Sequence, residues 1–146
     1  MRYPAAITRE GKNTLAEFPD CPGCQTFARP GESIEAQAAD VLQGWLESEL
    51  LEGRTPPMPR QRLPRGGIWV EVPPLLAIRI AIKRARTAAG LTQAQLAKRV
   101  GVTQPAIAAL EHPDSNPTLQ TLEKVARALG ANLQVSLEPA GKKSAA

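Results

Sequence analysis

Residues that start and stop helices divide the stretch from residue 73 to residue 130, and this punctuation constrains the fold more than any other feature of the chain. Thr92, Thr103 and Thr118 each stand just before a segment with helical apolar spacing, where a hydroxyl can accept from an unpaired backbone N–H. A glycine follows the first, second and fourth segments, as is typical of helix ends. The pattern predicts short helices over residues 74–90, 92–101, 104–111 and 118–130.

Only three residues, Gly101-Val102-Thr103, join the second and third predicted helices. From residue 67 onward the chain is basic, with ten Lys and Arg against five Asp and Glu. Two short helices joined by a tight turn in a small basic domain match the helix-turn-helix plan. In that plan the first helix of the pair crosses the DNA backbone and the second enters the major groove, so the sequence predicts a DNA-binding module.

The same stretch resembles the phage-repressor and Cro-like (XRE-type) family over about residues 75 to 130. The matching motifs are Leu91-Thr92-Gln93-Ala94-Gln95-Leu96-Ala97, Gly101-Val102-Thr103-Gln104, Leu110-Glu111 and the later Thr121-Leu122. Their order and distances agree with those of the family. The resemblance implies that Gln104 reads a base, and a Gln in the major groove can bond bidentately to adenine N6 and N7.

The resemblance also implies roles for other residues near Gln104. Gln93 contacts a phosphate and braces the reading side chain, while Arg86 and Glu111 form a structural pair between the first and third helices. Positions where relatives carry further polar readers hold proline or alanine here, so we expect few base contacts and much of the affinity from phosphates. The expected DNA contacts are Thr92, Gln93, Lys98, Arg99, Thr103, Gln104, Ala108 and Asn116.

These residues also have simpler interpretations. Gln104 could be a solvated first-turn residue, and Lys98 and Arg99 could belong to a solvated helix face. His112, the only histidine, is expected to be a turn residue or a phosphate donor. The Ile and Leu stripes are expected to form core.

The segment Asn132-Leu133-Gln134-Val135-Ser136-Leu137 alternates polar and apolar residues and predicts a strand. A lone strand on a helical domain needs a partner. It could pair with its copy across a dimer axis or with residues 68–72, and the sequence does not choose between them. Residues 139–146 are expected to be a loose tail.

The net charge of +4 is distributed unevenly along the chain. Residues 1–52 hold four basic and nine acidic residues, which gives a net charge of −5. Residues 53–66 contain four Arg, four Pro and no acid, a composition typical of an extended linker. The acidic front therefore suits a basic partner and the basic back suits a polyanion.

The acidic front is predicted to form a small sheet covered by one helix. Strands are expected over residues 3–8, 14–18 and 25–28, and a helix capped by Ser33 is expected to end near Glu52. One helix covers only one side of such a sheet and leaves strand edges free. We therefore expect this unit to pair with itself or with another chain.

The front also resembles the HicB antitoxin family over about residues 1 to 60. The matching segments are Met1-Arg2-Tyr3-Pro4-Ala5, Glu17-Phe18-Pro19-Asp20-Cys21-Pro22-Gly23-Cys24, the helix entry at Gly31 to Glu35 and the Pro-rich end at Thr55 to Pro59. The resemblance implies a partly built RNase H-like or ferredoxin-like fold that masks a small, basic, mRNA-cleaving HicA-type toxin. The expected toxin contacts are Phe18, Asp20, Glu35 and Glu49.

Cys21 and Cys24 form a Cys-x-x-Cys motif, for which structural thiols are the favoured interpretation, ahead of an intermolecular metal or disulfide and of redox catalysis. Two Cys and one His cannot by themselves complete a four-ligand zinc site, so no metal or cofactor is expected. Nuclease chemistry would need clustered carboxylates around magnesium, and only Glu17 and Asp20 lie near strand ends. We expect no enzymatic activity.

No apolar run is long enough for a membrane span and no signal-peptide core follows Met1, so a cytoplasmic location is expected. The predicted fold is α+β, with a toxin-binding sheet and helix (1–52), a linker (53–66), an all-α helix-turn-helix domain with a terminal strand (67–138) and a flexible tail (139–146). The expected function is an antitoxin that neutralises a HicA-type toxin and represses its own operon, bound to operator DNA as a homodimer that could assemble further into a tetramer. The alternative is a stand-alone XRE-type repressor whose front domain senses a small molecule.

Overall fold

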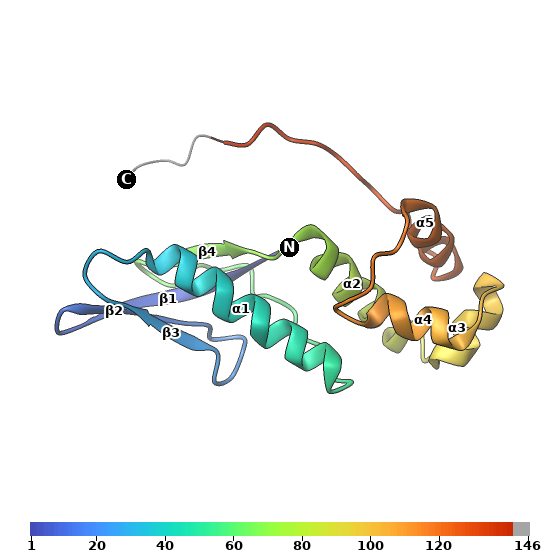
Figure 1. The fold of residues 1–146 in the computed structure, drawn as a ribbon, viewed down its shortest axis with the longest axis horizontal. Helices are drawn as coiled ribbons and strands as arrows, with labels where there is room; N and C mark the ends of the chain where they lie inside the picture. The colour runs from blue at the N-terminus through green and yellow to red at the C-terminus, as the bar shows by residue number, and fades with distance from the viewer. Residues whose placement is uncertain (142–146) are drawn as a thin grey trace.

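The structure, a computed structural model, describes residues 1–141 and places a small sheet with one helix at one end and a group of helices at the other (Figure 1). The sheet region contains β1 (Arg2–Glu10), β2 (Asn13–Glu17), β3 (Gln25–Ala28), α1 (Ile34–Leu51) and β4 (Ile68–Glu71). The helical region contains α2 (Pro74–Ala88), α3 (Gln93–Val100), α4 (Gln104–Glu111) and α5 (Leu119–Ala128). The predicted α+β class is confirmed.

The four strands form one antiparallel sheet in the order β3-β2-β1-β4. β1 is long enough to pair with β2 through its second half and with β4 through its first half, where Tyr3 lies opposite Val70. β4 thus belongs to the N-terminal sheet, although the expected division at residue 67 grouped it with the helices. Residues 68–71, within the range considered as a partner for residues 132–137, pair with β1.

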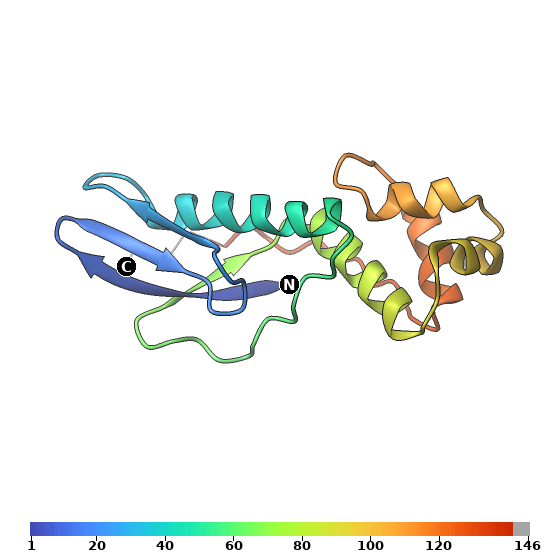
Figure 2. The same cartoon turned by 90° about the horizontal axis from the view of Figure 1, so that it is seen from below.

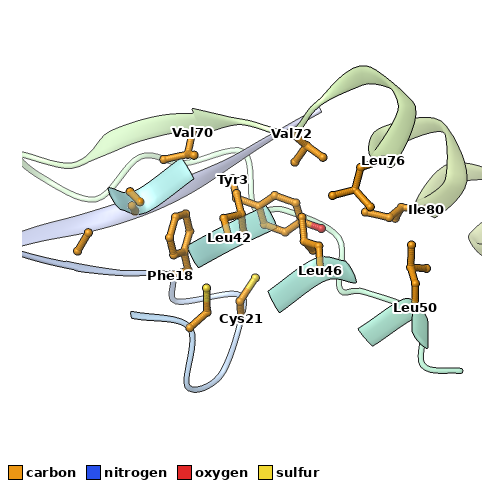
Figure 3. Close-up of a cluster of buried hydrophobic side chains, with 14 residues drawn as sticks. Tyr3, Phe18, Cys21, Leu42, Leu46, Leu50, Val70, Val72, Leu76 and Ile80 are labelled. Atoms are coloured by element: carbon orange, nitrogen blue, oxygen red, sulfur yellow. The ribbon is translucent and has the colours of Figure 1, made fainter. Parts of the chain in front are cut away.

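One face of the sheet is covered by α1, which begins where Ser33 accepts a hydrogen bond from the Ala36 N–H (3.2 Å). Its buried residues recur every four positions and point at the sheet, where Tyr3 and Phe18 meet Leu42 and Leu46 (Figure 3). Burial of each such leucine stabilises the fold by about 1.5–3 kcal/mol. This packing forms the first of two apolar cores.

The linker is held against the sheet region by hydrogen bonds. The Tyr3 hydroxyl donates to the Pro57 carbonyl (2.7 Å), and Arg84 of α2 donates to the Pro56 carbonyl (2.7 Å). Just after the linker, Gly67 passes so close to β1 that a Cβ there would lie 2.4 Å from the Ala5 carbonyl oxygen. The linker is therefore an anchored segment that returns the chain from the end of α1 to β4 (Figure 2).

Helix α2 belongs to both regions of the molecule (Figure 2). Leu76 and Ile80 pack in the core of the sheet region, whereas Ile82 packs with Leu96 and Ile107 in the core of the helical region. The first core therefore extends beyond the sheet and α1 into the helix that begins the helical region.

The predicted strand over residues 132–137 does not form within residues 1–141. A strand needs a neighbour for its backbone N–H and C=O groups. The candidate neighbour in the same chain, β4, pairs with β1 on one edge and does not pair with this segment on the other. The segment extends from α5 back toward the sheet region (Figure 1). The predicted tail is described only to residue 141, and its last residues, 142–146, lie outside the described part. Among the described residues, no helix is both long and apolar enough to cross a membrane.

Candidate nucleic-acid interface

Helices α3 and α4 form at the predicted residues and are joined by a turn of three residues. Thr92 caps α3 through the predicted capping box, in which its hydroxyl accepts from the Gln95 N–H (3.1 Å) and its own N–H donates to the Gln95 side chain (2.9 Å). Gly101 ends α3 in the left-handed conformation (φ 80°), which side chains other than glycine rarely adopt. Thr103 then caps α4 by accepting from the Ala106 N–H.

A chain of hydrogen bonds runs from the buried interior to the exposed start of α4. Arg86 of α2 donates from Nε and Nη2 to the two carboxylate oxygens of Glu111 (2.5 and 2.9 Å). Gln93 Nε2 donates to the same carboxylate (3.1 Å), and Gln104 Nε2 donates to Gln93 Oε1 (2.8 Å). Each side chain is thus positioned by the one before it, and the chain ends at the expected base-reading residue.

The inner end of this chain is almost fully removed from solvent. Arg86 is 9% exposed and Glu111 is 4% exposed, and Arg86 also donates to the Leu91 carbonyl (2.8 Å). Removal of one member of such a buried pair costs about 3–5 kcal/mol because it leaves the other charge unpaired. The network therefore holds Gln93 and Gln104 in place with a strong anchor, and the predicted structural pair is present.

The other predicted DNA contacts all lie on α3, α4 or the segments beside them. Lys98 and Arg99 are exposed on the last turn of α3, and neither is paired with an acid among residues 1–141. They line a shallow open depression of about 350 Å³ together with Leu91 and Gln95. The hydroxyls of Thr92 and Thr103 are used as caps, Ala108 is half-buried, and Asn116 is exposed in the loop after α4.

Two buried cations near this site escaped the sequence prediction. Arg79 and Lys83 of α2 are 4% and 5% exposed, and burial lowers the pKa of both groups. Arg79 donates to the Ser115 carbonyl and contacts the Ser115 hydroxyl (3.3 Å), which fixes the loop that carries Asn116. The available signal was the spacing of residues 79, 83 and 86, which places three basic side chains on one face of a helix.

The structure revises the expected toxin contacts. Phe18 is 1% exposed and packs in the first core, so its side chain is not accessible to a partner in this structure. Asp20 accepts from the Nε (2.6 Å) and the backbone N–H (3.0 Å) of Arg60, and Glu49 accepts from Arg54 (2.5 Å). Glu35 alone of the four stays exposed without a basic partner among the described residues. Phe18 is an apolar residue beside a turn, and the sequence alone is equally consistent with a place in the core. The contacts of Asp20 and Glu49 were not predicted because the linker residues Arg60 and Arg54 were not recognised as their partners.

Cys21 and Cys24 form a tight loop in which backbone N–H groups of residues 18, 21 and 24 all donate within the loop. Both thiols are free and buried, and Cys24 Sγ lies 3.8 Å from the Val41 carbonyl. Burial is the main cause that raises the pKa of Cys21 to about 12 and that of Cys24 to about 11. Thiols that are buried and have a raised pKa are unreactive, which fits a structural role. Within residues 1–141 no group of three His, Cys, Asp or Glu is placed so that it could hold a metal ion.

A capped helix pair joined by three residues, with a braced glutamine at the start of the second helix, defines a DNA-binding domain of the helix-turn-helix class. A family model described as helix-turn-helix matches residues 82–135. Antitoxin HigA1 of Mycobacterium tuberculosis is 48% identical over 48 residues, which cover 33% of this chain and 32% of that protein.

Two further relatives match almost the whole chain. Antitoxin HicB 1 of Photorhabdus laumondii is 30% identical over 140 residues, which cover 94% of this chain and 88% of that protein. Antitoxin HicB 2 of the same organism is 24% identical over 135 residues, which cover 92% of this chain and 95% of that protein. The chain belongs to the HicB antitoxin family, and it carries an XRE-type helix-turn-helix domain at its C-terminal end.

Proposed function

We propose that this chain neutralises a HicA-type mRNA-cleaving toxin through its sheet region and represses its own operon through its helical region. The observation that carries the proposal is the hydrogen-bond chain from Arg86 through Glu111 and Gln93 to Gln104. A fixed amide at the start of the recognition helix serves sequence-specific reading of DNA, and the family membership supplies the antitoxin role.

Operator reading rests on Gln104, with Lys98 and Arg99 as phosphate contacts. A Gln held in one orientation loses less rotamer freedom when it bonds to adenine. One such helix reads few bases, so we infer a homodimer, and higher assemblies such as a tetramer remain compatible with it. Two recognition helices spaced by roughly 34 Å, or a multiple of it, would read an inverted repeat.

Toxin binding rests on the acids that the linker leaves unpaired. Arg54 and Arg60 occupy Glu49, Glu52 and Asp20, so these carboxylates contribute little to the outer field. Glu35 and Asp40 on α1 are exposed and unpaired in the described chain. We assign the attraction of a basic toxin to this helix, where complementary charge would raise the rate of association.

The proposed antitoxin acts by covering its partner in the cytoplasm and needs no catalysis of its own. Asp20, one of two acids considered for magnesium binding, is held by Arg60. We expect RNA to stay intact with the wild-type chain and with a variant in which Glu17 and Asp20 are both mutated. RNA cleavage by the wild-type chain that is lost in this variant would favour a nuclease.

Co-expression with a HicA-type toxin tests the first half of the proposal, and binding to upstream DNA tests the second. We expect the two proteins to co-purify and the pair to relieve growth arrest, and we expect the purified chain to bind the DNA upstream of its own reading frame. Glu35→Lys should weaken the first interaction and leave the second unchanged. DNA binding without any toxin binding would favour the stand-alone repressor, and absence of both interactions would refute the proposal.

A further inference from the structure

An open groove of about 710 Å³ lies where the helical region meets the end of β4. Its lining is largely apolar and includes Leu75 and Ile78 of α2 and Leu122 of α5. Of the large apolar side chains that the chain exposes, Met1 (40%), Leu119 (60%) and Val135 (64%) all line this one groove. Exposed apolar residues gathered in one place mark an interaction surface.

One wall of the groove is formed by residues 133–136. They belong to the segment 132–137, which has the composition of a strand but no strand partner within residues 1–141. Its backbone groups make no hydrogen bond to any residue in that range. Leu133, Val135 and Leu137 alternate with polar residues, and Leu137 is 99% exposed. The segment carries no charge, so two copies of it can meet without repulsion.

We propose that this segment forms an antiparallel strand pair with the same segment of a second copy, and that the pair covers the groove. Opposite residues of an antiparallel pair lie on the same face of the sheet. Because the apolar residues occupy alternate positions, a pairing that keeps them together must be centred on a residue and not between two residues. Only a centre at Val135 pairs all three apolar residues of the segment among themselves, and it sets Leu133 opposite Leu137 and Gln134 opposite Ser136.

The end of β4 is the competing partner, since Glu71 and Val72 line the same groove. β4 ends at Glu71, however, and its ladder with β1 covers residues 68–71 only. At the groove, β4 therefore has little more than its last residue available for pairing with the six-residue segment. A second copy of the segment can pair along its length. The two-fold pairing also supplies the second recognition helix on which the proposed operator reading rests.

The test is a disulfide across the two-fold axis of the full-length chain. In the proposed register the Val135 Cα atoms lie about 4.5–5.5 Å apart, within the range of about 4.4–6.8 Å that disulfides span. Val135→Cys should therefore give a covalent dimer under mild oxidation. The native Cys21 and Cys24 are buried, and the wild-type chain serves as the blank.

Gln134→Cys is the matched control, because its partner position is Ser136. Alone it should stay monomeric on a non-reducing gel, and mixed with Ser136→Cys it should give a covalent dimer. Equal crosslinking of Gln134→Cys and Val135→Cys alone would overturn the register. No crosslinking of Val135→Cys in a chain that sedimentation shows to be dimeric, or a purely monomeric chain, would overturn the interface. An intramolecular disulfide in Glu71→Cys/Gln134→Cys would assign the segment to β4 and also overturn it.

A charge placed on the apolar face gives a second test. Val135→Lys sets two like charges opposite each other and should separate the dimer, whereas Gln134→Lys on the polar face should leave it intact. Loss of the second half-site should weaken binding to an inverted repeat by about 100-fold, while binding to a single half-site stays unchanged. Because crosslinking requires no DNA, a crosslinked chain that ignores its operator would refute the proposed function and leave the interface standing.

Discussion

The two regions of the molecule are held together in different ways. The first core contains fourteen buried apolar residues from the sheet, α1 and the start of α2, whereas the second contains seven. The four buried charged side chains of the described residues, Arg79, Lys83, Arg86 and Glu111, all belong to α2 and α4. An apolar core stabilises without regard to direction, while a hydrogen-bonded ion pair also fixes orientation. The region that must aim a side chain at DNA is the one that buries its charges.

The largest expected effect tests this contrast at Glu111. Glu111→Gln keeps the side-chain shape but leaves Arg86 charged and unpaired, so the free energy of unfolding should fall by about 3–5 kcal/mol in urea titrations. The control is Glu123→Gln, which removes an exposed pair with Arg127 and should change stability by less than about 1 kcal/mol. A loss at Glu111 no larger than at Glu123 would show that the buried pair contributes no more than a surface pair.

A double substitution separates the effect of the buried pair on stability from its effect on the orientation of Gln93 and Gln104. Arg86→Met with Glu111→Leu removes both charges together, and stability should recover most of what Glu111→Gln loses. Operator discrimination should not recover, since Gln93 loses its anchor. Recovery of both properties would contradict the role given to the network.

Alkaline pH should weaken the sheet region more than the helical region. Burial raises the pKa of Tyr3 and Cys21 to about 12 and that of Cys24 to about 11, so these groups stay neutral in the folded chain after they ionise in the unfolded one. Their contribution is complete below about pH 8 and is lost as pH rises toward 12, by about 3 kcal/mol at pH 10. Cys21→Ala/Cys24→Ala should flatten this part of the pH profile, measured by urea unfolding. An unchanged slope would assign the alkaline loss to other groups.

A loss of similar or smaller size is expected at the reading residue itself. Gln104→Ala should reduce discrimination between operator and random DNA by about 1–3 kcal/mol, measured as a ratio of dissociation constants. Arg99→Ala should weaken both by the same factor and lower the salt dependence by about one unit. Equal losses on both DNAs for Gln104→Ala would refute base reading.

The smallest effect is expected for an ion pair with one exposed partner. The side chain of Arg60 is 53% exposed and that of Asp20 is 8% exposed, and Asn at position 20 can still accept from the Arg60 N–H, so Asp20→Asn should cost only about 1 kcal/mol. It should, however, free the linker, and limited digestion with trypsin should cut after Arg60 and Arg62 faster than in wild type. Unchanged digestion would show that the linker is held by its other contacts, through Pro56 and Pro57.

Local signals in the sequence were sufficient to predict the helices and most of the sheet. The hydroxyls of Thr92, Thr103 and Thr118 act on residues three positions away, so the chain itself contains both partners of each cap. The first three strands were predicted for the same reason, from alternation and short turns. The Gln93–Gln104 contact came from family resemblance, since eleven residues separate its two side chains.

The features that the sequence did not reveal depend on distant partners. Arg60 finds Asp20 forty residues away, and no local pattern indicates that a proline-rich segment will return to a turn loop. The burial of Arg79 and Lys83 was not predicted, because their helix spacing shows which face they share but not what packs on it. The strand at 68–72 was visible as a strand, while its pairing with β1 depended on the path of the linker.

The shared helix α2 fixes the angular phase between the two ends of the molecule. Each residue added to a helix rotates the remainder of that helix by about 100°, so one insertion between Ile80 and Ile82 would swing the apolar residues of one core out into solvent. Insertions and deletions are thus excluded there in practice, although they are tolerated in surface loops. The recognition helix therefore keeps a constant orientation relative to the sheet, and a protein bound to the sheet would approach the DNA double helix in one fixed orientation.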